Sequence, residues 1–209
     1  MKIAVVGAGN VGGTLGKLWS DKGHEIRFAV PDPNSPKLKE LLGTMRGGVH
    51  AASNREAAAA SEVVALAVPW PAAEQAIKAC GDLRSKVLID CTNPLRADLT
   101  GLVLGHTTSA AEQVAGWSGA KMVKAFNTLG AGLYGQAEFD GTRADGFYCG
   151  DDAAAKTTVK QLIADIGLNP VDVGPLRNAR LLEPMAMLWI DLAINQGWGA
   201  RHAFKLMRR

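Results

Sequence analysis

The sequence predicts an α/β fold with a doubly wound, mostly parallel sheet and a C-terminal helical extension. Three observations lead to this prediction: apolar runs of strand length alternate with helix-length segments, a glycine-rich turn follows the first apolar run, and the alternation stops after Gly174-Pro175. Such alternation is typical of βαβ units, whose helices cover both faces of a sheet. We expect a domain over residues 1–174 and an extension over residues 175–209.

Most of the expected strands are short and continuously apolar, as burial on both faces requires. The expected strands are Ile3–Val6, Glu25–Val30, Val63–Val68, Val87–Asp90, Lys121–Ala125, Phe147–Cys149 and Pro170–Val173. The expected helices are Val11–Lys22, Pro36–Leu42, Asn54–Ala60, Pro71–Cys80, Ala110–Trp117 and Ala153–Ile166. Asn54 and the pair Asp151-Asp152 stand where side chains can cap a helix by accepting backbone N–H bonds.

The extension has a broad apolar helical face with no strand after it. Its apolar residues are Leu181, Leu182, Met185, Met187, Leu188, Ile190, Leu192 and Ile194. We expect this helix to pack over the sheet edge, and a wall of the substrate pocket or a dimer seam stays open beside that interpretation. A homodimer with a two-fold contact is the expected assembly.

Composition and charge exclude several classes of protein. Hydrophobic residues make up 47% of the 209 residues, as in an ordinary globular protein, and the formal net charge is only +3. No basic stripe with interleaved aromatic residues is visible, so we expect no nucleic-acid partner. The four histidines show no ligand spacing, so we expect no metal site.

Cysteine usage and hydropathy indicate the compartment. Cys80, Cys91 and Cys149 are widely spaced and form no CxxC pair, which favours a reducing environment over a disulfide framework. No apolar stretch approaches the length of a membrane span. We therefore expect a cytoplasmic protein without a membrane partner.

A glycine-rich turn carries the chemistry. The residues Gly7, Ala8, Gly9, Asn10, Val11 and Gly12 form a GxGxxG motif between the first expected strand and an amphipathic helix. Gly7 permits the tight turn, Gly9 lets the backbone approach a pyrophosphate, and Gly12 lets the helix lie close to the strand. The opening N–H groups of the helix can then bind phosphate oxygens. This context predicts a Rossmann-type site for a nicotinamide dinucleotide.

The end of the second expected strand decides between NAD and NADP, and its residues allow both. Asp32 lies twenty residues beyond Gly12, which suits an acid that binds the ribose 2′-OH, yet Asp32 follows Pro31 and could instead cap the turn at Pro33-Asn34. Ser35, Lys37 and Lys39 could instead neutralise a 2′-phosphate.

The chain resembles the family of F420-dependent NADP oxidoreductases and is similar to the N-terminal oxidoreductase domain of the STEAP metalloreductases. The matching segments are Ile3 to Gly12, Gly23-His24-Glu25-Ile26, Val68-Pro69-Trp70, Lys124-Ala125-Phe126-Asn127-Thr128, Cys149-Gly150-Asp151-Asp152 and Gly174-Pro175-Leu176. The resemblance implies NADP as the cofactor, with NAD as the alternative, because Val30-Pro31 stand where relatives place a Ser or Thr and an Arg.

The resemblance also implies which further loops meet the cofactor. Val68, Pro69 and Trp70 are expected to border it, and the loop from Asn127 to Ala131, with Leu129 and Gly130, is expected near the nicotinamide. Both segments follow expected strand ends, where the ligands of such sheets bind. Asn93 follows another strand end and serves either a turn or a cofactor contact.

Hydride transfer between a nicotinamide and a flat acceptor, such as F420 or a flavin, needs stacking geometry more than an acid. We therefore expect no catalytic side chain, and a small apolar pocket between the loop Asn127–Leu133 and the C-terminal helix, where Gly130 and Gly132 admit a flat ring. A carbonyl or imine reductase is the alternative and would need a proton donor, for which His106, Lys124 and Tyr134 are the candidates. A dinucleotide-binding regulatory protein without turnover is the third hypothesis.

Overall fold

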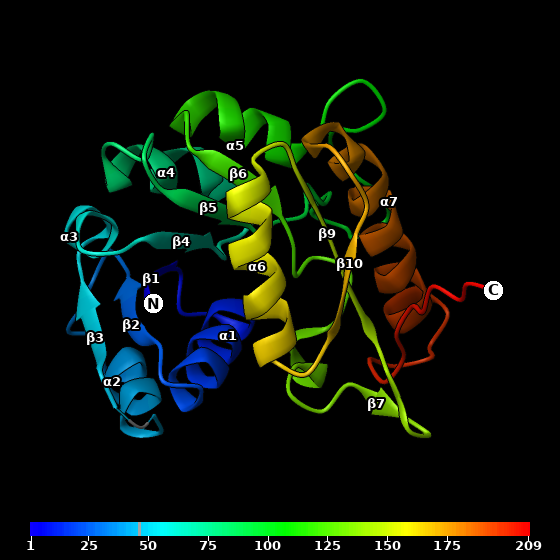
Figure 1. Cartoon of the computed structure of the whole chain (residues 1–209), viewed down its shortest axis with the longest axis horizontal. Helices are drawn as coiled ribbons and strands as arrows, with labels where there is room; N and C mark the ends of the chain where they lie inside the picture. The colour runs from blue at the N-terminus through cyan, green and yellow to red at the C-terminus, as the bar shows by residue number, and fades with distance from the viewer. Residues whose placement is uncertain (46) are drawn as a thin grey trace.

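The computed structural model describes residues 1–45 and 47–209, except for the side chain of Lys37. Across these residues an eight-stranded sheet has the order β10-β9-β6-β5-β4-β1-β2-β3 (Figure 1). Its strands are β1 (Lys2–Val6), β2 (Glu25–Ala29), β3 (Val49–Ala52), β4 (Val63–Leu66), β5 (Val87–Asp90), β6 (Lys121–Lys124), β9 (Asp145–Gly150) and β10 (Asn169–Asp172). A separate hairpin pairs β7 (Glu138–Phe139) with β8 (Thr142–Arg143).

Strand direction and order confirm the expected fold class. The strands from β3 to β6 are all parallel, β9 runs antiparallel to β6, and β10 is parallel to β9. The chain lays β2 and β3 on one side of β1 and continues with β4 on the other, so the order reverses at β1. In sheets of this kind a ligand binds at such a switch point, outside the carboxyl ends of the strands.

Helices cover both faces of the sheet. They are α1 (Asn10–Asp21), α2 (Pro36–Gly43), α3 (Asn54–Ala59), α4 (Ala73–Cys80), α5 (Ala110–Ser118), α6 (Ala153–Asp165) and α7 (Ala179–Ile190). Side chains of α1, α2 and α6 pack into one apolar cluster, and those of α3, α4, α5 and α7 pack into a second cluster on the opposite face. In Figure 1, α4 and α5 lie above strands β4 to β6, whereas α1 and α2 lie below them.

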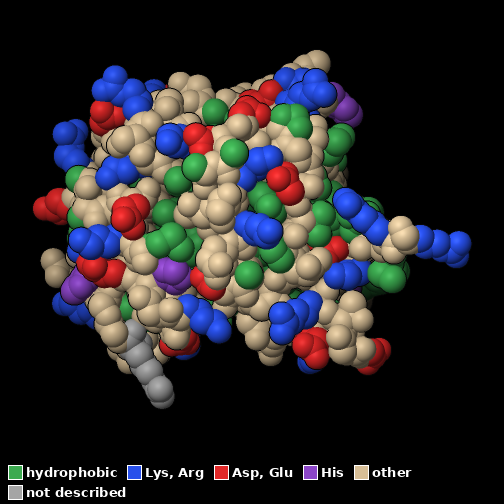
Figure 2. Space-filling view, in the orientation of Figure 1, with side chains coloured by type: hydrophobic (Ala, Val, Ile, Leu, Met, Phe, Trp, Pro, Cys, Tyr) green, Lys and Arg blue, Asp and Glu red, His purple; other side chains and the backbone are tan. Residues whose placement is uncertain are grey.

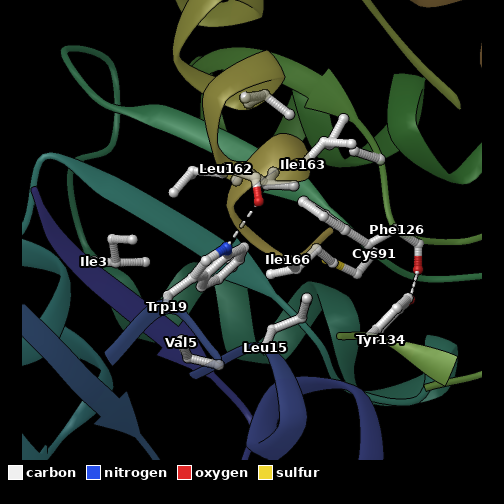
Figure 3. Close-up of a cluster of buried hydrophobic side chains, with 14 of the residues drawn as sticks. Ile3, Val5, Leu15, Trp19, Cys91, Phe126, Tyr134, Leu162, Ile163 and Ile166 are labelled. Carbon is white, nitrogen blue, oxygen red and sulfur yellow. Dashed lines mark hydrogen bonds between the residues drawn. The ribbon is translucent and has the colours of Figure 1, made fainter. Parts of the chain in front are cut away.

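The first apolar cluster is centred on a buried tryptophan. Trp19 of α1 is fully buried, and its indole N–H donates a hydrogen bond of 3.1 Å to the carbonyl of Leu162 in α6 (Figure 3). Its ring lies edge-on to Phe126, 5.5 Å away between centroids. This contact fastens α1, and with it the glycine turn, to the strand that ends at Lys124.

The expected strands and helices are all present, with small shifts of their boundaries. The structure also contains short strands that the sequence does not predict. The expectations omit β3, β7 and β8: β3 is a half-buried edge strand, and β7 and β8 have two residues each. The expected cap Asn54 is wrong, because Ser53 caps α3: its hydroxyl accepts the N–H of Glu56, whose carboxylate accepts the N–H of Ser53. Asp152 caps α6 as expected.

The C-terminal helix covers the sheet beside α5. Leu176, Ala179 and Leu182 are buried in the second cluster, and Ala186 is also buried. A π-helical turn (Asp191–Asn195) continues α7. Leu181, Leu188 and Ile194 face outward and are exposed. Within the described residues, no helix combines the length and the apolar character needed to cross a bilayer.

Candidate functional site

The glycine turn lies at the carboxyl end of β1, at the switch point of the sheet. Gly7 has a φ of 100°, and a Cβ there would lie 2.6 Å from the carbonyl oxygen of Ala67, after β4. A Cβ on Gly12 would collide with the carbonyl oxygen of Gly7. Both positions therefore need glycine, so that the start of α1 can lie directly against the turn.

The start of α1 is open. Its N-cap is Gly9, which makes no side-chain cap bond in the described structure, and the first turn has no acidic residue. A Cβ on Gly9 would meet nothing within 4 Å, and Ala8, Gly9 and Asn10 line an opening of about 390 Å³ together with Glu40. Unpaired N–H groups at a helix start attract an anion, so this geometry fits a diphosphate.

A second opening adjoins the turn on the side of β2. It is a cavity of about 400 Å³, a size typical of small-molecule sites. Its lining residues are Val6, Gly7, Ala29, Val30, Pro31, Ser53, Asn54, Arg55, Val68, Ala72, Gln75, Ala76 and Ala79. The structure thus brings three expected site residues, Gly7, Pro31 and Val68, together around one cavity.

Asp32 and Ser35, two further candidates after β2, are not among the described residues that line this cavity. The carboxylate of Asp32 accepts the N–H of Asn34 at 2.9 Å, so it caps its own turn, one of the two roles considered from the sequence. Ser35 is the N-cap of α2, and its hydroxyl makes no capping bond with the described residues. The side chain of Lys37 lies outside the described part of the chain.

Trp70 has a partner of its own. It opens a short 3-10 turn (Trp70–Ala72) after Pro69, and its ring stacks on Trp117 of α5, 5.5 Å away between centroids. The stacking holds α4 and α5 together behind the loop that contains Val68.

Asn93 and Asn127 join the loops after β5 and β6. The Asn93 amide donates to the backbone oxygen of Asn127 at 3.0 Å, and the Asn127 amide donates to the side-chain oxygen of Asn93 at 3.1 Å and to the carbonyl of Leu182 at 3.2 Å. Phe126 has a positive φ of 59°, a conformation that bulky residues rarely adopt. These loops are therefore fixed against α7.

The loop after Asn127 packs against α7. Leu129 is buried, Ala131 is half-buried, and a Cβ on Gly130 would lie 2.6 Å from the indole of Trp189. The flat ring at Gly130 is therefore the protein's own Trp189, whereas a Cβ on Gly132 would meet nothing within 4 Å.

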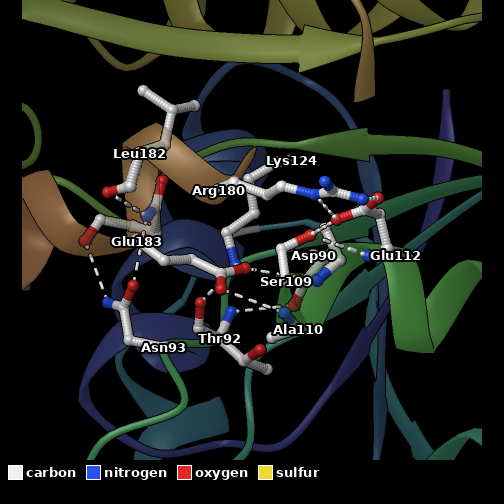
Figure 4. A network of polar contacts seen from close by, with 12 residues as sticks. Asp90, Thr92, Asn93, Ser109, Ala110, Glu112, Lys124, Arg180, Leu182 and Glu183 are labelled. Carbon is white, nitrogen blue, oxygen red and sulfur yellow. Dashed lines mark hydrogen bonds and ion pairs between the residues drawn. The ribbon is translucent and has the colours of Figure 1, made fainter. Parts of the chain in front are cut away.

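A fully buried ionic cluster lies behind these loops (Figure 4). The ammonium group of Lys124, at the end of β6, lies 2.8 Å from Asp90 of β5 and 3.0 Å from Glu183 of α7. Glu183 also accepts the backbone N–H groups of Ala110 at 2.9 Å and Ala111 at 3.2 Å, where α5 begins. The cluster thus joins two strands and two helices.

The cluster decides the protonation of its members. Burial alone would lower the pKa of Lys124, but Asp90 and Glu183 outweigh it and raise that pKa, so the ammonium stays charged. Burial raises the pKa of Glu183, against the opposing effect of Lys124. Lys124 therefore has the charged partners expected from its place inside a strand. Because it is buried and paired, it is not available to donate a proton to a substrate.

Tyr134 is also unsuited to proton donation. Its hydroxyl is buried and donates to the carbonyl of Phe126 at 2.6 Å, and burial raises its pKa (Figure 3). His106 is exposed and lines a groove of about 420 Å³ with Pro184 and Met187 of α7. Of the three candidate acids, His106 alone reaches the surface.

Several residues of the site region escape sequence reasoning. Glu183 lies within an apolar helical pattern, Asp90 ends an apolar strand, and Arg55 belongs to an ordinary alanine-rich helix start. The one available signal is Lys124, a cation inside a buried strand that requires an anionic partner.

The sheet order and the glycine turn at its switch point define a Rossmann-type α/β protein. Residues 2–94 match the family model described as NADP oxidoreductase coenzyme F420-dependent. The F420-dependent NADP reductase of Methanothermobacter thermautotrophicus is 30% identical, with 93% of this chain and 90% of that protein covered. The chain belongs to the F420-dependent NADP oxidoreductase family and is an NAD(P)-dependent oxidoreductase.

Further relatives agree with this family. A solved structure from Arthrobacter sp. FB24, assigned as an F420-dependent NADP reductase, is 33% identical, covers both chains fully and superposes with a TM-score of 0.90. The metalloreductase STEAP3 of Rattus norvegicus is 27% identical over 89% of this chain and 36% of its own length. An imine reductase from Myxococcus stipitatus shares the fold, with a TM-score of 0.65 at 22% identity.

Proposed function

We propose that this enzyme binds NADP(H) at the glycine turn and exchanges a hydride with a flat acceptor such as F420 or a flavin. The observation that carries the proposal is the open start of α1 at the switch point, where no side chain of the described residues caps the helix. The names of the reductases from two Methanothermobacter species support NADP and F420.

The chain's own residues would bind the diphosphate and the adenosine of the dinucleotide and orient its nicotinamide. The turn from Gly7 to Gly12, with Ala8, Asn10 and Val11, would hold the diphosphate, and the cavity beside Pro31 and Val68 would hold the adenosine. Asn93 and Asn127 fix the loops expected near the nicotinamide. A bound nicotinamide supplies the hydride chemistry, so the protein needs no side-chain acid for this step.

The remaining candidates have weaker roles in this proposal. Pro69 and Trp70 would border the cofactor from behind Val68, while Leu129, Gly130 and Ala131 would shape the nicotinamide end. Asp32 and Ser35 would shape the loop after β2, where the Asp32 carboxylate is bonded to the N–H of Asn34 and Ser35 is the N-cap of α2. Lys37 stays a candidate for the 2′-phosphate.

Assembly and location are also part of the proposal. Residues 175–209 would form an extension whose exposed Leu181, Leu188 and Ile194 meet a second copy of the chain in a two-fold contact. The free, buried cysteines support a reducing compartment, the cytoplasm. On the face seen in Figure 2, acidic and basic side chains are interspersed, as on an ordinary solvated surface.

The test is turnover by the purified protein. NADPH or NADH is mixed with F420, FMN, FAD, riboflavin or a ferric chelate, and oxidation is followed at the nicotinamide absorbance band. We expect oxidation of NADPH with F420 or a flavin. Binding without oxidation across all acceptors would contradict the proposed reaction and favour a regulatory protein.

A carbonyl or imine reductase is the second candidate, because His106 is exposed beside the groove formed with α7. Against it, this chain spans 61% of the length of the imine reductase from Myxococcus stipitatus. Carbonyl and imine compounds in the same assay, with wild type and His106→Gln, separate the two candidates. Turnover of these compounds that His106→Gln abolishes would favour the second.

A further inference from the structure

Among the described side chains, none at the end of β2 or in the loop after it, up to Ser35, supplies a cation to the cavity beside it. A Rossmann protein that binds NADP needs a positive charge near this strand end, to meet the 2′-phosphate of the adenosine. Here Val30 and Pro31 line the cavity, and the carboxylate of Asp32 is bonded to the N–H of Asn34 in its own turn. The segment that follows the neighbouring strand β3 also lines this cavity.

Arg55 reaches the cavity from that neighbouring strand. β3 pairs with β2 so that Ala52 lies beside Ala29, and the N–H of Val30 donates to the carbonyl of Ala52 at 3.3 Å. The chain then turns at Ser53 into α3, of which Arg55 is the second residue. Arg55 therefore lines the same cavity as Val30 and Pro31.

Arg55 is the one charged side chain among the described residues that line this cavity. Its neighbours are occupied: Glu56 is engaged by Ser53 in the helix cap, and the Asn54 amide donates to the carbonyl of Ala76 at 3.2 Å. Arg55 itself is exposed and forms no ion pair within the described chain, whereas Arg27, Arg84 and Arg180 are all paired with carboxylates.

We infer that Arg55 binds the adenosine 2′-phosphate of NADP(H) and gives the enzyme its preference for NADP over NAD. A guanidinium group presents a planar fork of N–H donors that matches phosphate oxygens. This inference rests on the proposed function, because it assumes that the adenosine occupies the cavity beside the glycine turn. The cation then comes from the start of α3 instead of the loop after β2.

The test compares two nucleotides that differ by the 2′-phosphate alone. Calorimetric titration of wild type with 2′,5′-ADP and with ADP should show tighter binding of 2′,5′-ADP. Arg55→Gln should weaken binding of 2′,5′-ADP roughly ten- to hundred-fold and leave ADP unchanged, and Arg55→Lys should restore part of the difference. Arg143→Gln, an exposed arginine on the distant strand β8, is the matched control and should behave like wild type.

The outcomes separate this inference from the function on which it rests. If neither nucleotide binds wild type, the proposed function fails. If wild type binds both equally, or Arg55→Gln keeps the full preference for 2′,5′-ADP, the inference on Arg55 is wrong while the cofactor site stands. An equal loss for both nucleotides would also overturn it, as would a loss of preference in Lys39→Gln but not in Arg55→Gln.

Discussion

Helices α1 and α5 each follow a strand of the parallel sheet along the chain. They differ in whether the N–H groups of the first turn have acceptors within the chain. At α5, the Ser109 hydroxyl accepts the N–H of Glu112 at 3.2 Å, and the carboxylate of Glu183 accepts the N–H groups of Ala110 and Ala111. At α1, Gly9 offers no side chain and the turn has no acid. One helix start is closed by an anion of the chain itself, and the other has no such anion among the described residues.

The difference shows how one physical preference serves two purposes. A helix start favours negative charge because its N–H groups lack partners and the helix dipole is positive there. At α5 this preference fastens α7 to the sheet through Glu183, whose charge Lys124 balances. At α1 the same preference remains unused within the chain, at the switch point where ligands of such sheets bind.

The largest expected effect comes from removing the cation that balances Glu183 at the closed start of α5. Lys124→Met leaves Asp90 and Glu183 buried without their cation, so we expect a loss of about 3–5 kcal/mol in the free energy of unfolding. Urea denaturation measures it. Lys121→Met, at the exposed end of the same strand, is the control and should change stability by less than about 0.5 kcal/mol. A loss in Lys124→Met as small as that of the control would show that the cluster does not stabilise the fold.

The second prediction places an anion at the open start of α1. Gly9→Asp places a carboxylate at the start of α1, in space that a Cβ can enter freely. We expect the ligand-free protein to keep or gain stability, by up to about 1 kcal/mol, because the carboxylate caps the helix. NADPH affinity measured by calorimetry should fall roughly hundred-fold, since the phosphate site is filled. Unchanged affinity in a folded Gly9→Asp variant would mean that the diphosphate binds elsewhere.

A smaller effect depends on pH and is confined to α5. The paired Arg180 and the hydroxyl of Ser109 hold the pKa of Glu112 below its ordinary value of 4.5. The folded state therefore binds fewer protons than the unfolded chain, and the stabilisation is complete above this value and is lost as pH falls through it toward the folded pKa. We expect Glu112→Gln to cost about 1 kcal/mol at neutral pH and progressively less in acid.

Denaturation curves of wild type and Glu112→Gln across this pH range measure that difference. A difference that grows in acid would reverse the sign and contradict the assignment. Glu112 belongs to α5 and not to the start of α1, whose first turn has no acidic residue. The nucleotide affinity of Glu112→Gln at neutral pH should therefore equal that of wild type.

Most of the fold can be predicted from the sequence because buried parallel strands are continuous apolar runs. The pattern fails at β3, where a four-residue edge strand, Val49–Ala52, is only partly buried and follows two glycines. It also misplaces the cap of α3, because Ser53 and Asn54 are both good caps and the choice depends on the partner Glu56.

The site is less predictable than the fold. The glycine turn is local in the sequence, so its residues and their spacing are visible without a structure. Arg55 and Glu183 act across the fold, on a cavity beside β2 and on the start of α5, and nothing within a few residues of either one signals the contact. Gly130 looks like room for a ligand until the structure places Trp189 against it.

The central claim is that the backbone N–H groups that open α1 bind a dinucleotide diphosphate. Amide resonances of the isotopically labelled protein, followed during titration with NADP⁺, test it most directly. We expect the amides of Gly9, Asn10 and Val11 to shift with saturation, while those of Ala110 and Ala111, already bonded to Glu183, stay in place. Saturable binding that leaves the α1 amides unmoved would contradict the claim.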